Sequence, residues 1–108
     1  MAIGGNSLRT RGKQPLYHSR RTRATRDACK QAIKKQIACH LAGGTHHAHK
    51  NFGSGYCVFN DLSYASKTLI KNNLVKKILI IDLDVHQGDG TAKILKNDKN
   101  FINNVIFY

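Results

Sequence analysis

Residues 76–91 read KKILIIDLDVHQGDGT and contain the clearest strand pattern in the chain. The four branched apolar residues from Ile78 to Ile81 predict a strand over 76–82. A continuous apolar run of this kind is typical of a strand covered on both faces in a parallel sheet. The segment therefore predicts an α/β protein in which polar residues follow directly on a buried strand.

The rest of the chain alternates between helix and strand patterns. The expected elements are a helix over 25–36, a strand over 37–42, a helix over 61–73 capped by Asn60, a short helix from Thr91 to Lys96 capped by Thr91, and a strand over 104–108. Glycine-containing loops separate these elements. The order implies an open α/β architecture.

Length and composition limit the class of protein. The 108 residues suffice for one small domain, and no stretch approaches the ~20 apolar residues of a membrane span. The basic N-terminus lacks the apolar run of a secretory signal. Cys29, Cys39 and Cys57 form no Cys-x-x-Cys pair, which argues against a zinc ribbon or a disulfide framework. We therefore expect a cytoplasmic protein with no membrane partner.

Positive charge is concentrated near the N-terminus. The formal net charge is +12, all six acidic residues are aspartates, and every arginine lies between Arg9 and Arg26. Few large apolar residues occur in 1–26, so we expect a disordered basic arm there and an α/β domain over 27–108. An arm of this kind is compatible with binding to nucleic acid or an anionic surface, and with a segment joined out of its original context.

Two polar clusters carry the candidate chemistry. Asp82, Asp84 and His86 follow the apolar strand and point to one side while the backbone stays extended. Carboxylate oxygen and imidazole nitrogen are both good zinc ligands. His46 and His47, after Gly43-Gly44, are candidate metal ligands or general bases. Solvated polar residues and an exposed histidine-rich turn are the alternatives.

Two other features of the sequence give little indication of a chemical role. Gly53-Ser54-Gly55 is too short for a phosphate loop, and no dinucleotide pattern follows it. Cys57 has no neighbour that marks it as a nucleophile, so it is expected to be a small buried residue.

Three stretches in this order resemble the histone deacetylase family: LAGGTHHA (41–48), GSGYCVFND (53–61) and KKILIIDLDVHQGDGT (76–91). Their residues resemble the bacterial and class IV type of deacetylase more than the class I type. The resemblance covers somewhat more than half of the chain. It implies a partial three-layer arginase/deacetylase-like α/β fold with a mainly parallel sheet.

The resemblance also implies roles for individual residues. Zinc would be held by Asp84 and His86, and a structural potassium ion would lie near Asp82, Asp84 and His86. The remaining implied roles are the paired acid–base histidines His46 and His47, their orienting carboxylates Asp82 and Asp89, and the acyl-chain channel lined by Gly55 and Tyr56. Tyr56 stands where the family more often has phenylalanine.

The implied reaction is zinc-dependent removal of acetyl from acetyl-lysine or a similar acetylated amine. The family's third zinc ligand and its oxyanion tyrosine lie downstream of the matched motifs, and neither is found before Tyr108. We therefore expect a truncated deacetylase that is inactive alone. The alternatives are a non-catalytic metal- or partner-binding remnant, a basic nucleic-acid-binding protein, and one piece of a split enzyme completed by a separate chain.

Overall fold

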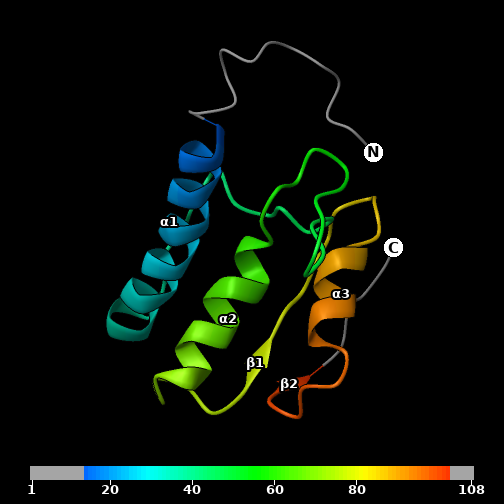
Figure 1. Ribbon diagram of the computed structural model, residues 1–108. Coiled ribbons are helices and arrows are strands. Elements are labelled where there is room, and N and C mark those ends of the chain that lie inside the picture. Colours follow the sequence, from blue (N-terminus) through cyan, green and yellow to red (C-terminus); the bar gives the residue numbers. More distant parts are fainter. Residues whose placement is uncertain (1–13, 103–108) are drawn as a thin grey trace.

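The computed structural model describes residues 14–102. Its elements, in chain order, are α1 (Gln14–Lys35), α2 (Asp61–Lys71), β1 (Ile78–Leu79), α3 (Asp89–Leu95) and β2 (Phe101–Ile102). α1 packs beside α2, and α3 lies on the other side of α2 from α1 (Figure 1). Among these helices, none combines the length and the apolar character needed to cross a membrane.

Helix α1 begins well before the predicted start at residue 25. It is 22 residues long and includes residues 14–26, so the prediction of a disordered arm is wrong for that part; residues 1–13 lie outside the described range. Thr22 and Thr25 are buried, so the helix packs through small polar side chains rather than large apolar ones. The guanidinium of Arg21 also donates two hydrogen bonds, at 3.0 and 2.7 Å, to the carbonyl oxygen of Ala42.

Helix α2 confirms the predicted cap. The Asn60 side chain accepts a hydrogen bond of 3.0 Å from the backbone N–H of Ser63, which satisfies one of the free donors of the first turn. The helix ends at Lys71, two residues before the predicted end. Asn73 has a φ of 55°, in the left-handed region, and there the chain turns toward β1.

The two strands are shorter than predicted. β1 pairs with β2 in parallel, with Ile78 opposite Phe101 and Leu79 opposite Ile102. Leu79 is 50% exposed and Ile81 is 56% exposed, whereas Ile78 and Ile80 are half-buried. The prediction that both faces are covered is therefore wrong within residues 14–102, because alternate side chains of this segment face solvent.

The remaining strand predictions have different outcomes. Residues 37–42 form no strand, and Leu41 is 96% exposed. This apolar run has no neighbouring strand to pair with in the described part of the chain. It therefore connects α1 to residues 43–49, called the histidine loop below, as irregular chain. The strand predicted over 104–108 lies outside the described residues.

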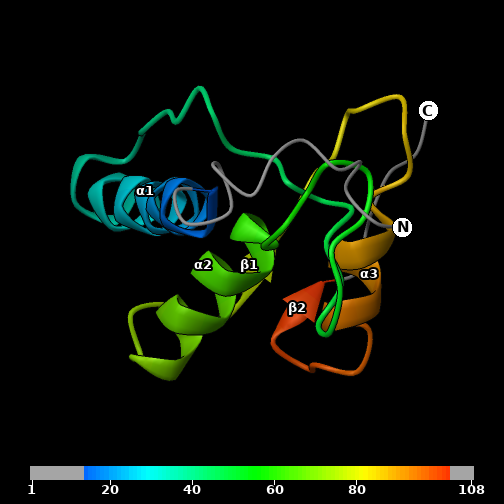
Figure 2. The ribbon, with the colours of Figure 1, turned by 45° about the horizontal axis from the view of Figure 1, so that its top comes forward.

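Helix α3 begins at Asp89, with Gly88 rather than Thr91 at the cap position. Thr91 is instead a buried residue inside the helix. Its backbone N–H donates to the carbonyl oxygen of His46 at 3.1 Å. This hydrogen bond joins the start of α3 to the histidine loop, and the loop before α2 runs beside α3 in the second view (Figure 2).

The core contains few apolar side chains. Its buried apolar residues are Ala48, Ala65, Leu69, Leu95 and Phe101. More of the buried side chains are polar, among them His46, Asn60 and Asp61. Hydrogen bonding therefore carries much of the packing around the histidine loop, and the buried polar groups have to be matched to one another.

Candidate active site

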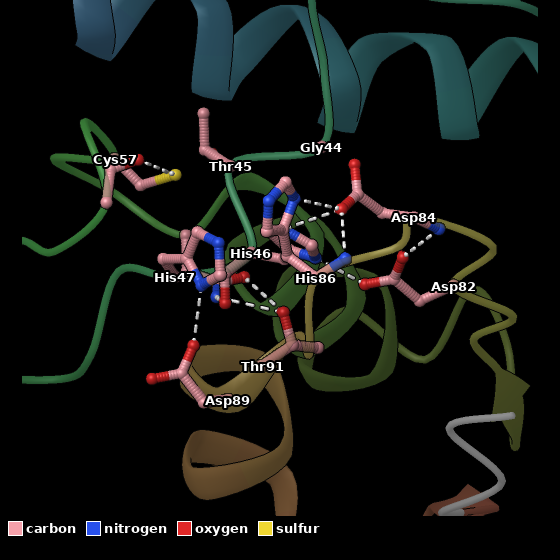
Figure 3. Close-up of polar contacts among 12 residues, drawn as sticks. Gly44, Thr45, His46, His47, Cys57, Asp82, Asp84, His86, Asp89 and Thr91 are labelled. Carbon is pink, nitrogen blue, oxygen red and sulfur yellow. Dashed lines mark hydrogen bonds and ion pairs between the residues drawn. The ribbon is translucent and has the colours of Figure 1, made fainter. Parts of the chain in front are cut away.

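Two histidine–aspartate pairs lie side by side, between the loop before α2 and the start of α3 (Figure 3). His46 Nδ1 lies 2.5 Å from Asp82 Oδ2, and His47 Nδ1 lies 2.7 Å from Asp89 Oδ1. The two imidazole rings have centroids 4.3 Å apart. Both histidines come from the loop before α2, whereas the aspartates follow β1 and open α3. The structure therefore forms both pairings that the resemblance implies.

The predicted metal residues form a tight turn next to this pair. The backbone N–H and the Nδ1 of His86 lie 2.7 and 2.9 Å from Asp84 Oδ1. The same oxygen lies 3.9 Å from His46 Nε2, so the turn and the histidine pair share one site. The hydrogen bonds from the backbone and side chain of His86 hold the pKa of Asp84 below its usual value. Asp84 is therefore a carboxylate with an exposed oxygen near neutral pH.

The turn offers two donors of the kinds that zinc prefers, a carboxylate oxygen and an imidazole nitrogen. Within residues 14–102, no group of three or more histidine, cysteine or acidic side chains is arranged to hold a metal. The donor chemistry therefore fits two positions of a zinc site that normally has three protein ligands. The potassium position near Asp82, Asp84 and His86 stays a prediction.

Asp89 binds two histidines, only one of which was expected. His47 bonds to one carboxylate oxygen, and His49 Nε2 lies 3.0 Å from the other. The hydrogen bond with His47, assisted by that with His49, lowers the pKa of Asp89 to about 2. The ring of His49 also stacks on Phe52, with centroids 4.4 Å apart. The adjacent histidines in the sequence drew attention to positions 46 and 47, but the side chain at 49 is equally part of this network.

Asp61 is the main site residue that the sequence analysis missed. It is 1% exposed, and its carboxylate accepts hydrogen bonds from Thr25 Oγ1 at 2.6 Å, Gly44 N at 3.0 Å and Thr45 N at 2.8 Å. The Thr45 hydroxyl lies 2.8 Å from the same group. Burial alone would raise the pKa of Asp61, but these hydrogen bonds outweigh it and hold the pKa below its usual value. Asp61 thereby ties α1 and the histidine loop to the start of α2.

Asn60 does more than cap α2. Its side-chain amide donates to the carbonyl oxygen of Ala48 and to Thr91 Oγ1, both at 3.0 Å. The amide also lies 3.4 Å from the carbonyl oxygen of His46. One side chain thus joins the histidine loop, α2 and α3. The only sequence signal for this role was the dipeptide Asn60-Asp61 at the end of an apolar run.

Glycines allow the backbone to approach the paired histidines closely. Gly55 has a φ of 50°, and a Cβ there would lie 2.6 Å from Cδ2 of His47. A Cβ at Gly88 would lie 2.6 Å from Asp82 Oδ2. A Cβ at Gly90 would overlap the carbonyl oxygen of Ala48. Each of these contacts leaves no room for a larger residue.

The two predicted channel residues differ in their surroundings. Gly55 is in contact with His47, as described above, whereas Tyr56 is 89% exposed. The acyl-chain channel therefore stays a prediction.

Cys57, predicted to be buried, is half-buried, and its Sγ lies 3.5 Å from the carbonyl oxygen of Gly55. All three cysteines are free thiols.

Comparison with known proteins places this arrangement in a family. The family model described as "Histone deacetylase domain" matches residues 14–107. An uncharacterized protein of Picosynechococcus sp. is 54% identical over 67 residues, which cover 62% of this chain and 22% of that protein. The histone deacetylase HDA1 of Candida albicans is 38% identical over 79 residues, covering 68% of this chain and 10% of HDA1.

Two further matches agree. The acetoin utilization protein AcuC of Staphylococcus aureus is 47% identical over 53 residues, covering 49% of this chain and 13% of AcuC. The crystal structure of a histone deacetylase homologue from Aquifex aeolicus matches with a TM-score of 0.74 and 32% identity, covering 81% of this chain and 23% of that one. The chain thus spans about a fifth or less of the curated relatives, and it belongs to the histone deacetylase family.

Proposed function

We propose that this chain supplies the acid–base pair and two metal ligands of a zinc-dependent deacetylase site. The observation that carries the proposal is the position of two buried or half-buried histidine–aspartate pairs beside an exposed Asp84–His86 turn. The substrate class is acetyl-lysine or a similar acetylated amine, which follows from the family rather than from a bound ligand.

The chain's own residues account for the proton transfers. Asp82 and Asp89 accept hydrogen bonds from the Nδ1 atoms of the two histidines and so fix their tautomers. The Nε2 atom of each imidazole is then the nitrogen left to take a proton from a water molecule or give one to a leaving amine. The carboxylates also stabilise the imidazolium formed on the way.

Asp84 and His86 are the residues that would hold zinc. When bound, zinc would polarise an amide carbonyl and lower the pKa of a coordinated water molecule. His46 Nε2, 3.9 Å from Asp84, is placed to act on groups held at that position. Among residues 14–102, no third protein ligand is grouped with Asp84 and His86, so we further propose that the 108 residues alone do not turn over substrate.

Zinc binding provides the first test. Titration of the full 108-residue chain with zinc at pH 7.5, followed by calorimetry, is expected to show saturable binding. Asp84→Asn and His86→Ala should each weaken the affinity by about tenfold or more, since each removes one ligand. His18→Ala, on α1, is the matched control and should leave the affinity unchanged. Equal affinity in all variants would overturn the metal assignment.

The same protein tests the inactivity. Incubation with an acetyl-lysine peptide and zinc is expected to release no acetate above a blank. Release that His86→Ala abolishes would show that the 108 residues are active by themselves. Release only after a second chain is added would support the split-enzyme alternative. The nucleic-acid alternative from the sequence analysis stays a prediction.

A further inference from the structure

The two carboxylates beside the paired histidines are not anchored in the same way. One oxygen of Asp82 contacts His46, and the other accepts a hydrogen bond of 3.0 Å from the backbone N–H of Asp84. The Asp82 side chain is also only 13% exposed. Asp89 is the first residue of α3, and its side chain is 42% exposed. An exposed carboxylate gains rotamer freedom by turning into solvent, so another group has to hold Asp89 in place.

The side chain of His49 holds the second oxygen of Asp89. His47 Nδ1 lies 2.7 Å from one carboxylate oxygen (Figure 3), and His49 Nε2 lies 3.0 Å from the other. The hydrogen bonds with His47 and His49 lower the pKa of Asp89 to about 2, so the group is a carboxylate at neutral pH. A carboxylate only accepts hydrogen bonds, so both ring nitrogens that face it carry hydrogen. The carboxylate therefore cannot turn away without losing a hydrogen bond.

His49 is itself held in place by its own loop. Its ring stacks on Phe52, with centroids 4.4 Å apart and ring planes 11° apart. Its backbone N–H donates to the carbonyl oxygen of Phe52 at 2.9 Å. The preceding residue, Ala48, is completely buried, and its carbonyl oxygen accepts a hydrogen bond from Asn60. The position of the His49 ring is thus set by contacts other than the one with Asp89.

We propose that His49 is a positioning residue for the acid–base histidine His47 and that it acts through Asp89. The Nε2–H of His49 holds one carboxylate oxygen, so that the other stays aimed at Nδ1 of His47. That second hydrogen bond keeps the hydrogen of His47 on Nδ1 and leaves its Nε2 free to exchange a proton. The inference deepens the proposed deacetylase chemistry and rests on it, because a fixed tautomer matters for proton transfer at His47.

Two substitutions separate the hydrogen bond of His49 from the packing of its ring. His49→Phe keeps a flat ring that can stack on Phe52 but removes the donor. His49→Gln loses the ring but carries an amide N–H about as far from the backbone as Nε2, so it can still donate to Asp89. A role in packing alone favours the phenylalanine variant, whereas a positioning role favours the glutamine variant.

The readout is the tautomer of His47 in the full 108-residue chain, measured by nitrogen-15 NMR of the imidazole rings in metal-free buffer. The spectra are recorded at pH 9, above the usual imidazole pKa of about 6.5. In the wild-type chain and in His49→Gln, His47 is expected to carry its hydrogen on Nδ1. In His49→Phe, the Nδ1–H share should fall about twofold or more, because Asp89 is free to turn away.

His46 is the internal control in the same spectra, because its carboxylate partner is Asp82. Its tautomer should stay the same in both variants, which also shows that the loop is folded. The proposal is overturned if His47 keeps its Nδ1–H share in His49→Phe, loses it equally in both variants, or changes together with His46. A wild-type chain in which His47 carries no hydrogen on Nδ1 would overturn the proposed acid–base arrangement as well, so the two failures are distinguished.

Discussion

Asp61 and Asp84 are both aspartates that accept backbone hydrogen bonds near the histidine pair, yet they are used in opposite ways. Asp61 is 1% exposed and is surrounded by donors from α1 and the histidine loop. The Asp84 side chain is 50% exposed, and its hydrogen bonds come from its own turn. Both oxygens of the Asp61 carboxylate are hydrogen-bonded within the protein, whereas the Asp84 carboxylate still presents an oxygen to solvent.

The difference separates a structural group from a proposed metal ligand. A buried carboxylate needs several donors to offset the cost of leaving water, and once it has them it has no lone pair to offer a metal. A carboxylate at an exposed turn loses little hydration and can bind a cation. Geometry therefore divides the two roles more clearly than residue type does. Three experiments test this division of roles.

The largest effect is expected from Asp61→Asn. An amide at this buried position keeps one acceptor oxygen but turns an NH₂ group either toward Thr25 and Gly44 or toward Thr45, so the backbone donor on that side loses its acceptor. The free energy of unfolding should fall by about 3 kcal/mol, measured by urea denaturation. Asp27→Asn, at an exposed position on α1, is the control and should cost less than about 0.5 kcal/mol. Equal losses in the two variants would contradict the division.

A smaller effect is expected from acid. The pKa of Asp61 is lowered in the folded state, so its carboxylate contributes stability above the unfolded value near 4, and this contribution is lost as the pH falls through the folded value. Asp89, with a pKa of about 2, acts in the same direction. Urea midpoints between about pH 5 and pH 2 should therefore decrease, and less steeply in Asp61→Asn. A parallel decrease in that variant would assign the acid sensitivity elsewhere.

The smallest effect on stability is expected from Asp84→Asn. The residue is exposed and its contacts are local, so the urea midpoint should stay close to that of the wild-type chain. The same variant should lose zinc affinity, as proposed above. A stability loss as large as that of Asp61→Asn would show that the turn is structural and that its two residues are not free to hold metal.

Sequence reasoning predicted the pairings of the site better than its supports. The contacts of His46 with Asp82 and of His47 with Asp89 were implied by the resemblance to the histone deacetylase family. Asp61 was seen only as the first residue of a helix. Its partners lie 16 to 36 positions away, and no local pattern reveals such contacts.

The fold predictions failed where packing was inferred from large apolar residues alone. Helix α1 was predicted too short because Thr22 and Thr25, which it buries, are not apolar. The run 37–42 was predicted as a strand because it is apolar, but a strand needs a neighbour, and none lies beside it in residues 14–102. The cap at Asn60 was predicted correctly because it depends on a contact only three residues away.

The glycines around the histidine pair have a consequence for how this segment can vary. A Cβ at Gly55, Gly88 or Gly90 would collide with His47, Asp82 or the Ala48 carbonyl, and the positive φ of Gly55 disfavours other residues there as well. A side chain at Gly55 or Gly88 would displace His47 or Asp82, and one at Gly90 would displace the backbone of the histidine loop at Ala48. In a library of random variants selected for function, these three positions should therefore accept as little change as the histidines themselves, although none of them carries a functional group.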